Sequence, residues 1–322
     1  MKKIVIFGGG SGLSQLLKGL KLFPIDVTAV VSVSDNGKST GRLRKDYNIP
    51  AVGDISKVLL SMSECDNEIR DLMNYRFTKS LTLGNHSIKN LLLTALLDLK
   101  GDFASALPIL VKLLDIKGNV LPLTEDNVDL VGITSEGKKL VGEEQITKTK
   151  KKIERITYSD EITVNSKVLD AVKKADLIIF SSGSLMTSII PHLLNQKLNN
   201  AIKASKAETM YICNLFTQPG ETDDYTVSDH IYLLEEYLGK NSIDVVLANN
   251  TKMNSALVKK YETTEQKDQV ILDGDKLKEM NKKVLADKIY KIEENRYRHD
   301  ALKTAYMIFS YLMDGYKNDI HN

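Results

Sequence analysis

The chain of 322 residues has little cysteine and no tryptophan: its only cysteines are Cys65 and Cys213. Two cysteines in unrelated contexts exclude a disulfide framework and a cysteine-based metal site, and they fit a reducing compartment. No apolar run reaches the length of a transmembrane helix, and the apolar run near the start is too short for a signal peptide. We therefore expect a cytoplasmic protein with no membrane partner.

An excess of charge of one sign is also missing. Lysine and arginine number 44 against 42 aspartates and glutamates, a net charge of +2. So small an excess creates no strong field for nucleic acid, so we expect no nucleic-acid partner. The hydrophobic content of 42% is ordinary for a globular protein with a real core.

Common nucleotide and catalytic motifs are absent as well. The segment Gly37-Lys38-Ser39 is similar to the end of a P-loop, but Ser32 stands where that motif needs its first glycine. The dinucleotide pattern G-x-G-x-x-G has Leu13 at its third glycine. We find no Ser/His/Asp order, no close glutamate pair and no metal-spaced His/Cys cluster, so we assign no catalytic residue and no metal ligand. Such a chain suits recognition of a phosphorylated, hydroxylated ligand better than demanding chemistry.

Short apolar runs that alternate with helical patterns are what the sequence does contain. The run 3–7 ends in three glycines, a helical pattern follows, and a second apolar run comes at 26–33. Continuous apolar runs of this kind are typical of strands buried on both faces of a parallel sheet. The sequence therefore predicts an α/β fold with a Rossmann-like, doubly wound, mostly parallel sheet. Further strands are expected at 175–180, 209–216 and 243–249.

The segment 118–159 has a different pattern, with short alternating stretches separated by turn residues. Such a pattern predicts β-hairpins that form a small insertion or flap. The helical patterns between residues 54 and 114 belong to packing faces. We therefore expect residues 1–117 and 160–322 to form the Rossmann-like domain and residues 118–159 to form the insertion.

Ligands of open parallel sheets bind beyond the carboxyl ends of the strands, so the loops there are the candidate site. The loop after the first strand lets the backbone approach an anion, and the following helix start adds free amides. A purely structural tight turn is the alternative. This loop comprises Gly8, Gly9, Gly10, Ser11 and Gly12.

The loop after the second strand begins with Asp35, a carboxylate suited to ribose hydroxyls. Hydroxyl and guanidinium donors suited to phosphate or sugar oxygens follow it. A capped, solvated helix start is the alternative here. These donors are Ser39, Thr40, Arg42 and Arg44.

Three further segments complete the candidate site. Asn85 is predicted to cap an apolar helix, beside His86, which by itself more often packs or caps than catalyses. The loop after 175–180 repeats the anion-binding helix start, and the long polar loop after 209–216 is typical of functional loops. These two loops contribute Gly183, Ser184, Asn214, Thr217 and Gln218.

Seven segments in order resemble the YvcK-type gluconeogenesis factors, relatives of the 2-phospho-L-lactate transferase CofD. The segments are "IFGGGSGLSQLLKGL", "VSDNGKSTGRLR", "VGDISKVLL", "LGNHSIKNLLLTAL", "ADLIIFSSGSLMTSIIPHLL", "NLFTQPGETDDYTVSDHI" and "RYRHD". The resemblance implies a CofD-like fold and a cytoplasmic bacterial protein that supports growth and cell shape on gluconeogenic carbon. It also implies a UDP-sugar ligand, particularly UDP-N-acetylglucosamine, and no required cofactor.

The resemblance also implies roles for individual residues. The ligand diphosphate would meet Gly10, Ser11 and Gly12. Tyr261 and Arg298 match a late tyrosine and arginine associated with uridine nucleotides, and an aromatic ring and a planar cation suit a base and its phosphates. The same cleft would be lined by Asp35, Ser39, Arg42, Asn214, Thr217 and Gln218.

Two departures from the family pattern leave alternatives open. The second loop reads Asp35-Asn36-Gly37-Lys38 instead of Asp-Asp-Gly-Gly, which weakens the case for a metal there. Ser181-Ser182-Gly183-Ser184 replaces a Gly-Pro-Gly-Ser turn. The alternatives are a CofD-like transferase, which would use Mg²⁺, and a dinucleotide-binding module. As partners we expect the UDP-sugar and proteins of cell-wall regulation, and self-association into a homo-oligomer stays open.

Overall fold

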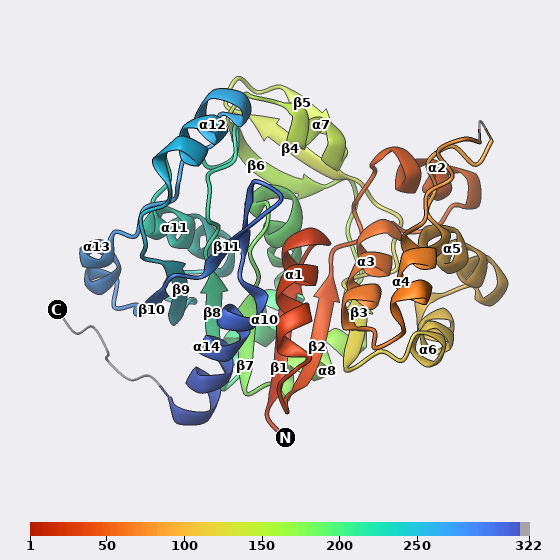
Figure 1. Ribbon diagram of the computed structural model, residues 1–322, viewed down its shortest axis with the longest axis horizontal. Helices are drawn as coiled ribbons and strands as arrows, with labels where there is room; N and C mark the ends of the chain where they lie inside the picture. The colour runs from red at the N-terminus through yellow and green to blue at the C-terminus, as the bar shows by residue number, and fades with distance from the viewer. Residues whose placement is uncertain (81, 316–322) are drawn as a thin grey trace.

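The computed structural model describes residues 1–80 and 82–315. Its centre is a sheet of seven strands in which each neighbouring pair is parallel (Figure 1). The predicted doubly wound, mostly parallel α/β fold is therefore confirmed. From one edge to the other the strands are β10 (Lys283–Asp287), β9 (Val245–Asn249), β8 (Glu208–Ile212), β7 (Leu177–Phe180), β1 (Lys3–Gly8), β2 (Asp26–Val31) and β3 (Asn119–Pro122).

The strands are apolar along their whole length because both faces of the sheet are covered. In β1, Ile4 and Ile6 point into one hydrophobic core, and Val5 and Phe7 point into a second core on the opposite face. Successive side chains of a strand alternate between faces, so two cores require an unbroken apolar run. This explains why the runs in the sequence show no polar alternation.

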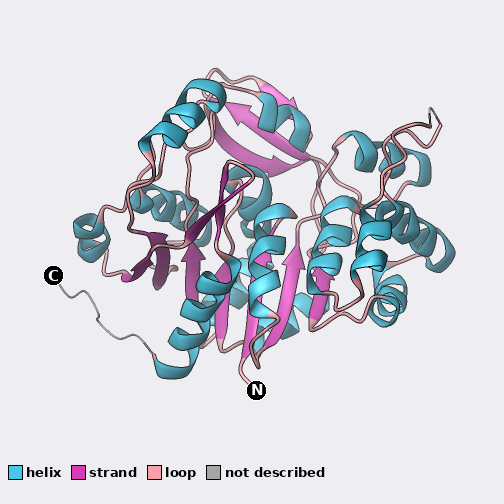
Figure 2. Cartoon of the chain, in the orientation of Figure 1, coloured by secondary structure: helices cyan, strands magenta, loops and turns pink. Residues whose placement is uncertain are grey.

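Helices cover both faces (Figure 2). None of the helices within residues 1–80 and 82–315 has the length and apolar character that a membrane span needs. One core contains side chains of α1 (Ser11–Leu20), α2 (Lys38–Tyr47), α3 (Gly53–Met62), α4 (Asn67–Asn74), α5 (Ile88–Lys100), α6 (Phe103–Leu113) and α14 (Ala301–Asp314). The other contains side chains of α8 (Ser166–Lys173), η1 (Leu185–Ile189), α9 (Ile190–Leu193), α10 (Gln196–Ala204), α11 (Val227–Leu238) and α13 (Gly274–Glu279).

A small antiparallel sheet stands above the carboxyl ends of the main strands (Figure 1). The predicted insertion of residues 118–159 was wrong in one respect: its first strand, β3, belongs to the main sheet and pairs with β2. An edge strand gave the alternating pattern that we interpreted as a hairpin. The insertion itself consists of β4 (Leu130–Thr134), β5 (Lys139–Val141), α7 (Glu143–Lys148) and β6 (Ile153–Tyr158).

The last part of the chain adds a hairpin of β11 (Tyr290–Glu293) and β12 (Arg296–His299). The hairpin lies beside α1, where the side chain of Gln15 donates to the carbonyl oxygen of His299 at 3.2 Å. Helix α12 (Ser255–Glu265) lies next to it, because the Asn254 amide donates to the hydroxyl of Tyr297 at 2.8 Å. These two elements border the carboxyl edge of the sheet (Figure 1).

The sheet has its topological switch between β1 and β7. From β1 the chain crosses to β2 through α1, whereas β7 returns to the other side of β1 only after the insertion. In open α/β sheets, loops diverge at such a switch and leave a crevice at the carboxyl ends. The fold therefore directs attention to the loops after β1, β2, β7 and β8.

Candidate functional site

The loops after β1 and β7 touch each other at the switch point. Gly12 has no room for a side chain, because a Cβ there would collide with the carbonyl oxygen of Ser182. The buried ring of His192 donates from Nε2 to the carbonyl oxygen of Gly8 at 3.1 Å. Burial lowers the pKa of His192 to about 4, so the ring is neutral at pH 7. Close packing therefore fixes the path of both loops.

The glycine loop faces the first turn of α3. The N–H of Gly10 donates to the carboxylate of Asp54, and a Cβ on Gly10 would collide with that carboxylate. The Nζ of Lys57 lies 3.4 Å from Asp54 Oδ1 and 3.2 Å from Ser11 Oγ. Burial raises the pKa of Asp54, Lys57 opposes the shift, and Asp35 adds to it. Asp54 and Lys57 were not among the predicted site residues, although both lie in the segment "VGDISKVLL".

Asp35 lies in the loop after β2, which ends at Val31 and so earlier than predicted, and its carboxylate organises the turn into α2. Oδ1 accepts from the Gly37 amide at 2.8 Å, and Oδ2 accepts from the Thr40 hydroxyl at 3.0 Å. Arg44, which we proposed as a phosphate donor, is buried and pairs with Asp129 at 2.9 Å. Arg44 therefore holds the base of the insertion.

Ser39 and His86 lie together behind this turn. Ser39 Oγ and His86 Nδ1 are 2.8 Å apart, and Asn90 Nδ2 lies 3.5 Å from the same hydroxyl. Burial and then the charge of Arg42 lower the pKa of His86, although Asp46 opposes the shift. The lowered pKa favours the neutral ring, and the tautomer of that ring sets which of the two groups donates in the Ser39–His86 hydrogen bond.

The prediction that Asn85 caps a helix was wrong. Helix α5 has Ser87 as its N-cap, and Asn85 lies in an exposed turn with a left-handed φ of 68°. The amide of His86 donates to the carbonyl oxygen of Leu83, so Asn85 lies inside a turn. The extended backbone that an N-cap residue needs is first found at Ser87. Arg42 is exposed, and its guanidinium donates to the carbonyl oxygen of Gly84 in the same turn.

The loops after β7 and β8 form one hydrogen-bonded unit. Asn214 Oδ1 accepts from the Gly183 amide at 2.8 Å, and its Nδ2 donates to the Gly183 carbonyl at 2.7 Å. Ser184 Oγ donates to Glu221 Oε2 at 2.6 Å, and Gln218 Nε2 donates to Glu221 Oε1 at 3.1 Å. Burial raises the pKa of Glu221 to about 7, while the Ser184 hydroxyl opposes the shift. The structure thus brings two predicted residues, Ser184 and Gln218, together around Glu221, which we had not assigned to the site, and it joins two more, Gly183 and Asn214, to each other.

Helix α7 of the insertion adds an acid that the sequence gave no signal for. The Glu144 amide donates to Asn36 Oδ1 at 2.9 Å, so α7 starts against the loop after β2. Glu143 precedes it, and its carboxyl group is hydrogen-bonded to the side chain of Thr187 in η1. Burial, then Asp35 and Asp54, raise the pKa of Glu143 to about 8. The insertion therefore covers the loops after β2 and β7.

Thr217 and Tyr261 both contact neighbours in or beside the loop after β8, Thr217 through hydrogen bonds and Tyr261 mainly through its ring. Thr217 is buried and exchanges two hydrogen bonds with Asp268, at 2.8 Å and 2.9 Å. The ring of Tyr261 stacks on Phe216, with ring centres 4.5 Å apart and planes 16° apart. Its hydroxyl accepts from the Tyr297 amide at 3.1 Å. Tyr261 therefore lies beside the polar loop, with part of its surface exposed.

Arg298 lies on β12, one residue beyond the aromatic cluster. Its side chain is 48% exposed, and its Nε lies 3.8 Å from Glu293 Oε2. Side chains alternate along a strand, so Arg298 points to the opposite face from Tyr297. Its ion pair therefore lies within the hairpin of β11 and β12.

The predicted residues therefore fall into neighbouring groups along one edge of the sheet. A Cβ on Gly9 would collide with Ser188 of η1, which connects the glycine loop to the group around Glu221. Asp54 connects the glycine loop to Asp35. Within the described ranges, no three His, Cys, Asp or Glu side chains are arranged to hold a metal ion. The donors that remain, an ammonium, hydroxyls and amides, suit an anion bearing sugar oxygens.

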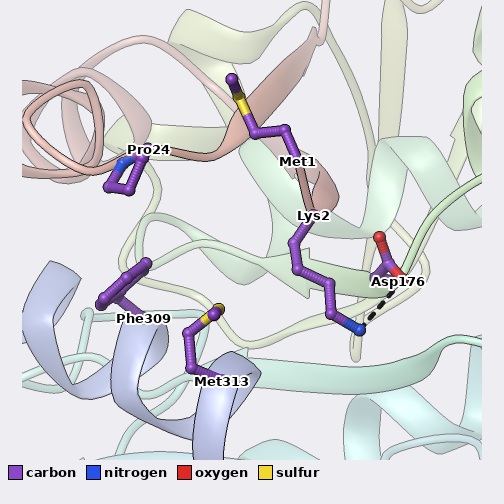
Figure 3. A pocket seen from close by; sticks show the side chains of 6 residues that line it. All are labelled: Met1, Lys2, Pro24, Asp176, Phe309 and Met313. Atoms are coloured by element: carbon purple, nitrogen blue, oxygen red, sulfur yellow. Dashed lines mark hydrogen bonds and ion pairs between the residues drawn. The ribbon is translucent and has the colours of Figure 1, made fainter.

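A hollow of about 400 Å³ lies at the opposite edge, where β1 begins (Figure 3). Lys2 pairs with Asp176 in it at 3.3 Å, and Phe309 and Met313 of α14 form an apolar side. This hollow lies at the amino ends of the strands, where no loop described above reaches. We assign the candidate site to the carboxyl edge, because the polar donors converge there.

The chain is similar to known proteins over nearly its full length. The family described as 2-phospho-L-lactate transferase CofD matches residues 4–290. The gluconeogenesis factor of Bacillus subtilis is 39% identical over 313 residues, covering 97% of this chain and 98% of its own. That of Halalkalibacterium halodurans is 39% identical over 305 residues, covering 94% of each chain.

A solved structure is also similar. The crystal structure of a UPF0052 family member from Bacillus halodurans superposes with a TM-score of 0.92 at 38% identity, covering 96% of this chain and 99% of that one. Sequence and structure thus agree over nearly the full length. The chain belongs to the CofD family and, within it, to the gluconeogenesis factors.

Proposed function

We propose that the protein binds a nucleotide sugar of the UDP-N-acetylglucosamine type and acts as a regulator. The observation that carries the proposal is the glycine loop at the switch point, with a hydroxyl and an ammonium group beside it. The ammonium group of Lys57 and the hydroxyl of Ser11 are 3.2 Å apart there. Hydrogen-bond donors at a glycine-rich helix start favour a diphosphate.

The neighbouring loops supply partners for the rest of such a ligand. Ser184, Asn214 and Gln218 carry hydroxyl and amide groups suited to sugar oxygens. Tyr261 offers a ring, and Arg298 a guanidinium, for the uracil and its phosphates. We propose that a nucleotide sugar spans these loops from the glycine loop to α12 and β12.

The regulatory role rests on the relatives, which are named gluconeogenesis factors. We propose that ligand occupancy is signalled to proteins of cell-wall regulation in the cytoplasm, and that this supports growth and cell shape on gluconeogenic carbon. A strain without the gene should grow poorly and lose its shape on a gluconeogenic carbon source. Normal growth and shape of that strain would remove the physiological part of the proposal. Light scattering of the purified protein determines whether it is a homo-oligomer.

Calorimetric titration with UDP-N-acetylglucosamine tests the binding directly. We expect binding without consumption of the ligand, and loss of binding in Arg298→Ala. Arg296→Ala is the matched control, since Arg296 is an exposed arginine on the same strand. Equal binding by the two variants would exclude Arg298 from the site, and absence of binding by the unmodified protein would refute the proposal.

A CofD-like transferase is the second candidate, because one observation favours it. Asp35 raises the pKa of Asp54, and Asp35 and Asp54 both raise the pKa of Glu143, so these three acids lie near one another. A divalent cation would relieve the repulsion between these acids, and transferase activity would then depend on that cation. Magnesium-dependent transfer of a phosphoryl-linked group from the nucleotide to an alcohol would establish this function. Titration with NAD tests the dinucleotide-binding alternative in the same series.

A further inference from the structure

Lys57 lies over the glycine loop although it comes from a different helix. Its Nζ is 3.2 Å from the hydroxyl of Ser11 and would be 2.8 Å from a Cβ on Gly10. The side chain is 41% exposed, so it reaches this point from the solvent side of α3. The space over the Gly10 backbone is therefore shared by an ammonium group, a hydroxyl and the carboxylate of Asp54.

The charge of Lys57 affects other ionisable groups besides Asp54, its partner in the ion pair. Burial, then Lys57 and Arg76, lower the pKa of Lys89 to about 8. The field of Lys57 is therefore not cancelled by Asp54, whose own pKa is raised by burial. Lys57 therefore acts on basic neighbours, since it lowers the pKa of Lys89 as Arg76 does, and on acidic ones, since it opposes the raised pKa values of Asp54 and Glu143. An anion at this position would relieve the repulsion between Lys57 and Lys89.

We propose that Lys57 is the cation that contacts the diphosphate of the ligand at the glycine loop. Its geometry carries the inference: the ammonium group of Lys57 is held beside the Ser11 hydroxyl and over the Gly10 backbone, so two donors can reach one phosphate group there. The inference rests on the proposed function and adds a residue to it. Ser11 then donates its hydroxyl to the same phosphate group.

The test compares Lys57→Met with Lys57→Arg and with the control Lys112→Met, which removes an exposed lysine from the last turn of α6. The probes are UDP-N-acetylglucosamine and inorganic pyrophosphate, each titrated calorimetrically. We expect Lys57→Met to weaken binding of both probes about tenfold to a hundredfold, since a hydrogen bond to a charged group is lost. Lys57→Arg should retain part of the affinity, and Lys112→Met should bind as the unmodified protein does.

Thermal unfolding of each variant shows whether it folds. Lys57→Met should melt close to the unmodified protein because its ion pair is partly exposed. If Lys57→Met does not fold, Lys57→Arg and Lys57→Gln carry the test with the same expectation for Gln as for Met.

The outcomes separate this inference from the proposed function. If pyrophosphate binds through Lys57 but the UDP-sugar does not bind, the inference stands and the proposed function fails. Should the UDP-sugar bind equally to Lys57→Met and to the unmodified protein, the inference is overturned and the proposed function stands. Absence of binding by both probes overturns both.

Discussion

Replacing Glu143 with glutamine should make the protein more stable at alkaline pH. The carboxyl group of Glu143 is surrounded by Asp35, Asp54 and Lys57, and burial is the largest cause of its raised pKa of about 8. Its folded form therefore holds a proton that the unfolded chain, with an ordinary pKa of 4.5, releases. Between these two values the folded state binds more protons, so the free energy of unfolding falls as pH rises.

The size of the effect follows from the two pKa values of this carboxyl group. The difference between 4.5 and about 8 corresponds to about 5 kcal/mol, at about 1.4 kcal/mol for each pH unit. Asp35 and Asp54 share the repulsion, and solvent screens the part of Glu143 that stays accessible. We therefore expect Glu143→Gln to gain about 2 kcal/mol or more over the unmodified protein at pH 9.

Urea unfolding at pH 5, 7 and 9 measures this gain. The unmodified protein should lose stability over this range, and Glu143→Gln should lose less. Glu161→Gln, which changes an exposed glutamate just after the insertion, is the control and should follow the unmodified protein. Equal pH dependence of Glu143→Gln and the unmodified protein would refute the argument that Glu143 is buried among other acids.

Three further predictions follow from neighbouring contacts. Asp54→Asn should bind pyrophosphate more tightly in calorimetry, because the substitution removes a negative charge beside the glycine loop; equal or weaker binding contradicts this. The folded state disfavours the charged ring of His192, so the free energy of unfolding falls as pH falls from 6.5 to about 4. His192→Leu should reduce this loss in urea unfolding, and an unchanged dependence of the free energy of unfolding on pH contradicts the prediction. Tyr261→Phe should cost about 1 kcal/mol for the lost hydrogen bond in urea unfolding, and Tyr261→Leu more, because stacking on Phe216 is also lost. Equal losses would contradict the stacking.

The sequence by itself determined the sheet and the glycine loop. Residues 3–7 form an apolar run because β1 is buried on both faces, and such a run can be recognised without knowing its neighbours. Asp35 is equally local, since its carboxylate bonds to Gly37 and Thr40 within the same turn. The predicted start of the insertion was wrong because β3, an edge strand of the main sheet, has the same alternating pattern as a hairpin strand. The predicted helix cap at Asn85 was wrong because a turn precedes the helix, whose N-cap is Ser87.

Only the tertiary structure decided which side chains share the site. Lys57 reaches the glycine loop from α3, Glu221 receives hydrogen bonds from Ser184 and Gln218, and Glu143 arrives from the insertion. Apart from the contact of Gln218 with Glu221 in the same loop, these contacts have no fixed spacing in the chain, because they join elements that are distant in sequence. Periodicity reports which face of an element is buried, whereas the pKa values and contacts of a site depend on groups that are distant in sequence and adjacent in space.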